Sequence, residues 1–187
     1  MRSFLLEIGT EELPPGVIAP VGEELLRRIA GLFAEHGLAT GPGEAFYTPR
    51  RLAVRIRDVP DEKPGRMVEV QGPPRRVGFD SAGKPTSTAV GFVRAQGRRV
   101  EDLYVKVTPK GEYLFLKKEV PPVPVMVLLQ ENIPGLILSL PFPKTMRWNE
   151  GAVRFSRPIR WILCLFGAEV VRFEHHGLVA GNWTRGH

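Results

Sequence analysis

Apolar residues recur every three or four positions through residues 16–36, which is the spacing of one face of an α-helix. Gly37 follows this stretch, as is typical of the position just after a helix. Residues 122–139 are apolar at the same spacing, although Pro134 should kink or split a helix there because its nitrogen carries no hydrogen. Thr86 is a favourable N-cap for a third, short helix.

Other apolar stretches have the alternation or the short length of β-strands. Residues 52–57 alternate apolar residues with arginine, which predicts a half-buried strand with arginines on its outer face. Residues 103–108 and 112–118 predict a hairpin around the turn Pro109-Lys110-Gly111. The same reasoning predicts strands at 3–8, 46–48, 66–71, 153–156, 160–166, 169–174 and 177–184.

Strand clusters are mixed with about three helices, and no regular βαβ alternation is present. This pattern predicts an α+β fold with mixed, mainly antiparallel strands. We treat residues 1–187 as one region, with a possible sub-boundary near residues 72–85, where proline and glycine concentrate.

The composition is that of a folded globular chain. Of its 187 residues, 43% are hydrophobic and 25% are charged, which excludes a disordered or collagen-like chain. No apolar run reaches about 18 residues, so we expect no membrane span. The single cysteine, Cys164, excludes an internal disulfide and cysteine-cluster zinc sites. Because the first residues lack the features of a signal peptide, we expect a cytoplasmic location.

The charge is unevenly distributed along the chain. The net charge is +6, but residues 1–49 contain three basic and seven acidic side chains, and residues 50–187 contain 23 basic and 13 acidic ones. Arginine accounts for 19 of the 26 basic residues, and it suits bidentate phosphate contacts. The basic part predicts a polyanionic partner, and the alternative is that these charges form ordinary solvated faces.

No standard catalytic or nucleotide-binding motif is present, so we expect neither a catalytic residue nor a metal site. The acidic residues Glu7, Glu11 and Glu12 flank Thr10 at the end of the first predicted strand. Paired carboxylates of this kind can perform acid–base chemistry or line a pocket. The alternative is structural, with Thr10 capping a turn and the carboxylates near a helix N-terminus or in an internal salt bridge.

Three segments place arginine or lysine beside a proline-stiffened turn and an aromatic or apolar strand: residues 48–52, 144–148 and 155–161. Such cations can pair with phosphates while an aromatic ring stacks on a base. The alternative is that they pair with internal carboxylates and hold the fold together. The candidates for RNA or partner contact are Arg50, Arg51, Lys144, Arg147, Trp148, Arg157 and Arg160.

Residues 4–15 (Phe-Leu-Leu-Glu-Ile-Gly-Thr-Glu-Glu-Leu-Pro-Pro) resemble the N-terminal signature of the bacterial glycyl-tRNA synthetase beta subunit. Further segments resemble the same family in the same order, and together they extend over essentially the whole chain. These segments are residues 48–53, 72–74, 79–86, 140–148, 155–161 and 184–187.

The resemblance implies an N-terminal fragment of a longer beta subunit, in an enzyme of two alpha and two beta subunits. It implies that the alpha subunit binds ATP and glycine, so that this region needs no cofactor. We therefore expect a non-catalytic region that supports the attachment of glycine to tRNA(Gly). Its expected partners are tRNA(Gly), the alpha subunit and the remainder of the beta subunit. The alternatives are a module that docks the alpha subunit without RNA contact and a vestigial editing-like domain.

Overall fold

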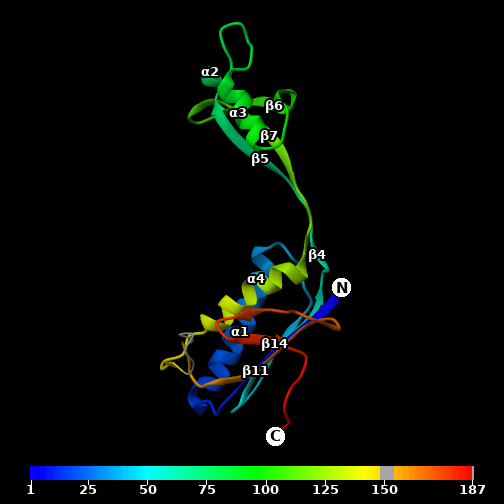
Figure 1. Ribbon diagram of the computed structural model, residues 1–187, viewed down its shortest axis with the longest axis vertical. Coiled ribbons are helices and arrows are strands. Elements are labelled where there is room, and N and C mark those ends of the chain that lie inside the picture. Colours follow the sequence, from blue (N-terminus) through cyan, green and yellow to red (C-terminus); the bar gives the residue numbers. More distant parts are fainter. Residues whose placement is uncertain (148–153, 187) are drawn as a thin grey trace. The chain divides into compact units, whose positions relative to one another are not determined.

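The computed structural model describes residues 1–147 and 154–186. The chain forms two compact units (Figure 1). Unit 1 consists of Met1–Lys63 and Val123–His187, and unit 2 consists of Pro64–Pro122. Unit 2 is therefore an insertion in the sequence of unit 1. A short antiparallel pair, β4 (Glu62–Lys63) and β8 (Val123–Pro124), lies where the chain leaves unit 1 and returns.

Unit 1 is built on a sheet with β1 (Arg2–Thr10) at its centre. The neighbours of β1 are β3 (Arg51–Val59) and β11 (Ile159–Phe166), both antiparallel to it. The strand order is β13-β14-β11-β1-β3-β2, with β12 also on β11. The outer strands are β2 (Gly43–Thr48), β12 (Glu169–Val170), β13 (Glu174–His175) and β14 (Leu178–Gly181). Only β14 pairs in parallel among the described strands of this sheet, which confirms the mainly antiparallel prediction.

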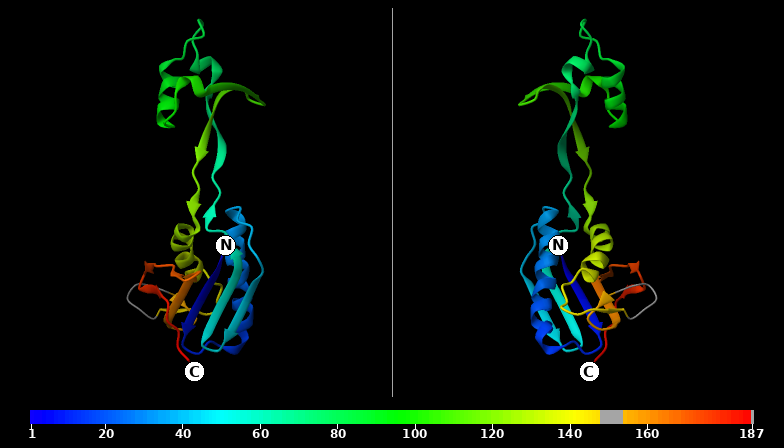
Figure 2. Two further views of the ribbon diagram at one scale, coloured as in Figure 1. Left: turned by 90° about the vertical axis from the view of Figure 1, so that its right-hand side faces the viewer. Right: turned by 90° about the vertical axis from the view of Figure 1, so that its left-hand side faces the viewer.

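Helices α1 (Pro15–Glu35) and α4 (Val125–Leu138) cover one face of this sheet (Figure 2). Alternate residues of β1, namely Phe4, Leu6 and Ile8, are fully buried and belong to one core cluster with the apolar side chains of both helices. Because side chains alternate across a strand, the other residues of β1 face the opposite side, which none of the described helices of unit 1 covers.

Helix α4 is continuous from Val125 to Leu138, so Pro134 does not split it. The proline removes one hydrogen bond from the helix, but its ring is buried together with Ile133 and Ile137. Burial of this apolar face offsets the missing hydrogen bond. A further two-stranded pair, β9 (Met146–Arg147) and β10 (Arg154–Phe155), follows α4 in the chain.

Unit 2 contains a three-stranded antiparallel sheet in the order β5-β7-β6. Its strands are β5 (Arg66–Pro74), β6 (Leu103–Thr108) and β7 (Gly111–Val120), which confirms the predicted hairpin. Helix α3 (Ser87–Ala95) begins at Thr86, whose hydroxyl accepts a hydrogen bond from the Ala89 backbone N–H, as expected of an N-cap. The one-turn helix α2 (Arg75–Gly78) was not predicted. A single 3₁₀ turn, η1 (Val100–Asp102), precedes β6.

The limits of unit 2 differ from the sub-boundary suggested near residues 72–85, which lies inside this unit. The proline and glycine residues there serve local packing instead of linking units. Pro74 follows a shift of register between β5 and β7 and immediately precedes α2. Gly78 lies so close to the sheet that an added Cβ would come within 2.3 Å of Leu114 Cδ1.

Candidate functional site

A hollow of about 400 Å³ lies in unit 1 where β1 ends and where β3 and β11 begin. It brings together five of the residues predicted from the sequence, which come from three separate segments. We call it the arginine hollow. Its lining consists of Thr10, Glu11, Thr48, Arg50, Arg51, Arg160, Trp161, Arg185 and Gly186.

Glu7 supports one side of the arginine hollow from within the sheet. Its side chain is buried, and its Oε1 accepts a hydrogen bond of 2.7 Å from Trp161 Nε1. The same oxygen accepts a hydrogen bond from the Thr184 hydroxyl and lies 3.6 Å from Arg51 Nε. Glu7 therefore links β1 to β11, to β3 and to the segment that follows β14, in the manner of the internal salt bridge considered above.

Trp161 lies flat against the backbone of β1. A Cβ added to Gly9 would lie only 2.0 Å from the indole ring, so the ring occupies the space that any other residue would need. The guanidinium carbons of Arg51 and Arg185 lie 5.8 Å and 5.9 Å from the centre of the Trp161 ring. Arg185 also lies 5.5 Å from the ring of Trp183. These cation–π contacts hold two guanidinium groups in place at the hollow.

Thr10 does not act as the predicted cap. Helix α1 begins after Pro14, has no side-chain cap, and has no acidic residue in its first turn, so the capping interpretation of Thr10 was wrong. Two prolines at this helix start leave fewer backbone N–H groups for a cap to satisfy. Thr10 is instead buried at the end of β1, and its hydroxyl has no hydrogen-bond partner among the residues that the structure describes.

The two neighbouring carboxylates have different surroundings. Glu11 lines the hollow and accepts a hydrogen bond of 2.5 Å from Arg160 Nε. Glu12 is exposed and does not line the hollow, but its backbone carbonyl accepts a hydrogen bond of 3.1 Å from Arg157 Nε. Arg157 also donates to the carbonyl oxygen of Ser156 at 3.2 Å, so its guanidinium is held by the backbone.

The other predicted cations remain available for a partner. Arg50 lines the hollow, is exposed, and forms no ion pair with any described residue. Lys144 and Arg147 are exposed on and before β9, and they do not line the arginine hollow. Trp148 lies outside the described residues. The structure thus gathers Arg50, Arg51 and Arg160 but leaves the 144–147 segment separate.

The division into two units shows that most of the net positive charge belongs to unit 2. Unit 1 contains 15 basic and 14 acidic residues, whereas unit 2 contains 11 basic and six acidic residues in a much shorter stretch of chain. Eight exposed cations of unit 2 form no ion pair with any part of the chain that the structure covers. They are Arg66, Arg76, Lys84, Arg94, Arg98, Arg99, Lys110 and Lys117.

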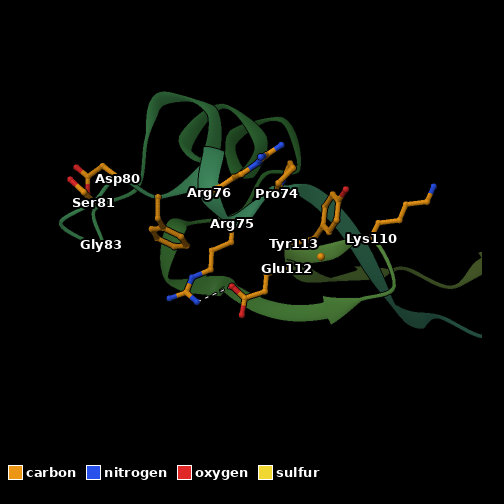
Figure 3. Close-up of a pocket in the computed structure, with 11 residues that line it drawn as sticks. Pro74, Arg75, Arg76, Asp80, Ser81, Gly83, Lys110, Glu112 and Tyr113 are labelled. Atoms are coloured by element: carbon orange, nitrogen blue, oxygen red, sulfur yellow. Dashed lines mark hydrogen bonds and ion pairs between the residues drawn. The ribbon is translucent and has the colours of Figure 1, made fainter.

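A groove of about 720 Å³ lies in unit 2 between α2, the turn after it and the β6–β7 turn (Figure 3). Arg75 points toward Glu112 and donates to its Oε2 at 3.0 Å. Asp80 accepts hydrogen bonds from the backbone N–H groups of Ala82 and Lys84, and so it is tied to its own turn. We call this feature the unit 2 groove.

The remaining lining of the unit 2 groove combines free cations with aromatic rings. Arg76 and Lys110 are exposed and line the groove, and Phe79 and Tyr113 are partly buried beside them. We had not selected these residues from the sequence, although Arg75 and Arg76 follow Pro73-Pro74. That is the same arrangement of arginine beside a proline-stiffened turn that selected the other candidates.

Within the described residues, no three His, Cys, Asp or Glu side chains gather as a metal site would require. Cys164 is buried in β11, and burial raises the pKa of its thiol, which disfavours the reactive thiolate. None of the described helices is both long and apolar enough to cross a membrane.

Comparison with known proteins shows which family and which relatives the chain resembles. Residues 4–187 match the family model described as the glycyl-tRNA synthetase beta subunit. The chain is 42% identical over its whole length to the glycine–tRNA ligase beta subunit of Oleidesulfovibrio alaskensis, and 40% identical to that of Desulforamulus reducens. It is also 42% identical, over 99% of its length, to the chloroplastic/mitochondrial glycine–tRNA ligase 2 of Arabidopsis thaliana.

The match covers only part of each relative. The chain spans 27% of the length of the two bacterial proteins and 17% of the length of the plant protein.

Proposed function

The chain belongs to the glycyl-tRNA synthetase beta-subunit family, and from this premise we propose that it supports the ATP-dependent attachment of glycine to tRNA(Gly) by contacting that tRNA. In this proposal the chain carries out no chemical step. ATP and glycine are bound by an alpha subunit, and the enzyme acts in the cytoplasm.

The observation that carries the proposal is the concentration of unpaired positive charge in unit 2. Unit 2 has 11 basic residues and only six acidic ones, and eight of its exposed cations have no ion pair among the described residues. Surface cations that are not neutralised internally attract a phosphate backbone and release its counterions on binding. A tRNA supplies such a backbone.

The unit 2 groove offers both kinds of contact that an RNA strand uses. Arg76 and Lys110 are free to pair with phosphates, because Glu112 is already engaged by Arg75 and Asp80 by backbone N–H groups. Tyr113 and Phe79 provide aromatic rings beside these cations. Base stacking on aromatic side chains and phosphate pairing together are typical of proteins that bind unpaired nucleotides.

The cations predicted from the sequence in unit 1 have a secondary place in this proposal. Arg51 and Arg160 pair with carboxylates, and Arg157 is held by backbone carbonyls, so each would have to exchange an internal partner for RNA. Arg50 and Arg147 have no such partner among the described residues and are the unit 1 side chains best able to reach RNA.

Salt-dependent binding of tRNA(Gly) tests the proposal. The variant Arg76→Gln/Lys110→Gln removes two cations of the unit 2 groove, so the slope of log K against log [salt] should become shallower by about 1.4 to 1.8. The matched control is Arg27→Gln/Arg172→Gln, which removes two exposed cations from unit 1. Arg28 still pairs with Glu24 in this control. An unchanged slope in the groove variant, or an equal change in the control, would contradict the proposal.

A second candidate function, docking of the alpha subunit or of the rest of the beta subunit, is favoured by apolar side chains on unit 1. Phe46 and Val179 lie on strands of the sheet with 50% and 59% of their surface exposed, and Trp183 is 48% exposed just after β14. Exposed aromatic residues are enriched at protein interfaces. Co-elution of the chain with purified alpha subunit, abolished by Phe46→Ser and Trp183→Ser, would support docking, and separate elution would count against it.

A further inference from the structure

Thr10, one of the residues that line the arginine hollow, has a buried hydroxyl without a partner among the described residues. Thr10 is 2% exposed, and its Oγ1 has no hydrogen-bond partner in the part of the chain that the structure covers. Its backbone is well satisfied, since its N–H donates to the carbonyl oxygen of Arg50 at 3.0 Å. Buried side-chain hydroxyls almost always have a partner, so one that lacks a partner beside a hollow indicates where a ligand can bind.

The charge around Thr10 indicates the sign of that ligand. Four guanidinium groups line the hollow, those of Arg50, Arg51, Arg160 and Arg185. Two carboxylates oppose them: Glu11 pairs with Arg160, and Glu7 lies beside Arg51. Positive charge therefore remains in excess, and Arg50 has no described ion-pair partner to release before it binds an anion.

The arginines are also held in position before any ligand arrives. Arg51 and Arg185 stack on Trp161, and Arg51 Nη2 donates a hydrogen bond to the carbonyl oxygen of Arg185. The indole ring of Trp161 is in turn held by close packing against the backbone of Gly9 and by its hydrogen bond to Glu7. Donors that are already immobilised lose little conformational entropy when an anion binds.

We propose that the arginine hollow binds the phosphate group of a nucleotide, with Arg50 pairing with the phosphate and the Thr10 hydroxyl donating to one of its oxygens. A phosphate offers several strong acceptor oxygens and suits the guanidinium fork. The hollow, at about 400 Å³, is larger than a phosphate and has room for an attached sugar. This site is in unit 1 and goes beyond the RNA contact proposed for unit 2.

Two sources can supply the same chemistry, a free nucleotide or the phosphate of an RNA end, and the probes distinguish them. The purified 187-residue chain is titrated with inorganic phosphate, with AMP, and with a short RNA that carries or lacks a 5′-phosphate. Tryptophan fluorescence and calorimetry report binding. Binding of AMP without a preference for phosphorylated RNA assigns the site to free nucleotides, and a preference for the 5′-phosphorylated RNA assigns it to an RNA end.

Substitution of Thr10 separates a ligand contact from a packing role. Thr10→Val keeps the shape and removes the hydroxyl, which has no internal bond to lose. Affinity for the bound probe should fall about five- to tenfold, because one hydrogen bond is lost, while the melting temperature of the free chain does not fall. Thr10→Ser restores the hydroxyl and should restore affinity. Unchanged affinity in Thr10→Val would overturn the assignment of this hydroxyl and with it the proposal.

Charge variants complete the test. Arg50→Gln should weaken binding of the phosphate probes by about tenfold or more, because a charge-assisted bond is lost. Arg172→Gln is the matched control in the same unit, outside the hollow, and should bind as the parent does. Arg76→Gln/Lys110→Gln should also leave this binding unchanged, so failure here is distinguishable from failure of the RNA contact in unit 2. Absence of binding to every probe at millimolar concentration would overturn the proposal.

Discussion

The two units of the chain use their cations in opposite ways. In unit 1, seven arginines of the described residues pair with carboxylates, and others are held by backbone carbonyls or stacked on tryptophan. In unit 2, only Arg75 and Lys106 form ion pairs within the region that the structure describes, and eight exposed cations form none. Most arginines of unit 1 therefore stabilise the fold, whereas most cations of unit 2 are available to a partner.

This difference shows why the linear charge pattern gave an incomplete picture. The acidic first 49 residues and part of the basic remainder fold together into unit 1, which has nearly equal numbers of basic and acidic residues. The insertion keeps most of the net charge. A tally along the sequence therefore indicated a basic region correctly but assigned its contacts to segments whose arginines are largely engaged internally.

The largest expected effect tests whether the two units have separate hydrophobic cores. Leu114 is fully buried in unit 2 against Gly78, and Leu114→Ala should cost about 2–5 kcal/mol of unfolding free energy. A unit of this size has only a few kcal/mol to lose, so β5, β6 and β7 should lose protection against hydrogen exchange while β1, β3 and β11 keep theirs. Leu25→Ala, in the core of unit 1, is the matched control and should affect unit 1. Equal loss in both units for either variant would contradict two separate cores.

A second prediction concerns the packing that supports the arginine hollow. Gly9→Ala places a Cβ 2.0 Å from the ring of Trp161, so the ring or β1 must move, at an expected cost of about 1–3 kcal/mol. Because Trp161 is one of three tryptophans, part of the tryptophan emission of the chain should shift toward that of an exposed indole. The control is Gly31→Ala in α1, where an added Cβ meets nothing within 4 Å. It should stabilise the chain by about 0.5–1 kcal/mol. A stable Gly9→Ala variant with unchanged fluorescence would contradict this packing.

The smallest expected effect tests whether an arginine–carboxylate pair of unit 1 stabilises the fold. Hydrogen bonds from Arg27 and Arg28 lower the pKa of Glu24 from its ordinary value of 4.5 to about 2. A carboxyl whose pKa is lower in the folded state stabilises the fold above the unfolded pKa, and this contribution is lost as the pH falls through the folded pKa. Because Glu24 lies at the surface, the effect should be small.

Glu24→Gln should therefore be less stable than the parent chain at pH 7, and this difference should shrink below pH 4.5 and vanish near pH 2. Urea unfolding at several pH values measures it. Glu35→Gln, which removes a carboxylate of the same helix that has no described ion pair, is the control and should show no such dependence. A difference for Glu24→Gln that persists at pH 2 would contradict the assignment.

Local structure could be predicted well from the sequence because its signals are local. The three longer helices, the β6–β7 hairpin and the N-cap at Thr86 follow from periodicity and turn chemistry within a few residues. The sequence did not show whether Pro134 would split α4, because this depends on burial of the helix face, which local sequence does not reveal. The one-turn helix α2 was missed because four residues carry too little periodicity to recognise.

The sites were harder to predict, because they join segments far apart in the chain. Arg50, Arg51 and Arg160 can be recognised in the sequence as neighbours of proline-containing turns, but nothing in their spacing shows that they meet Arg185 at one hollow. The role of Glu7 as an acceptor for Trp161 depends on the pairing of β1 with β11, 154 residues apart in sequence. For Thr10, the sequence could not distinguish a cap from a buried hydroxyl.

Hydrogen exchange of the chain with and without tRNA(Gly) tests the RNA contact of unit 2 most directly, because it reports which unit the RNA covers. If the RNA binds at the unit 2 groove, tRNA should slow exchange in residues 75–84 and 108–113. The variant Arg76→Gln/Lys110→Gln should reduce this protection. Protection confined to unit 1, with unit 2 unaffected by tRNA, would contradict this contact.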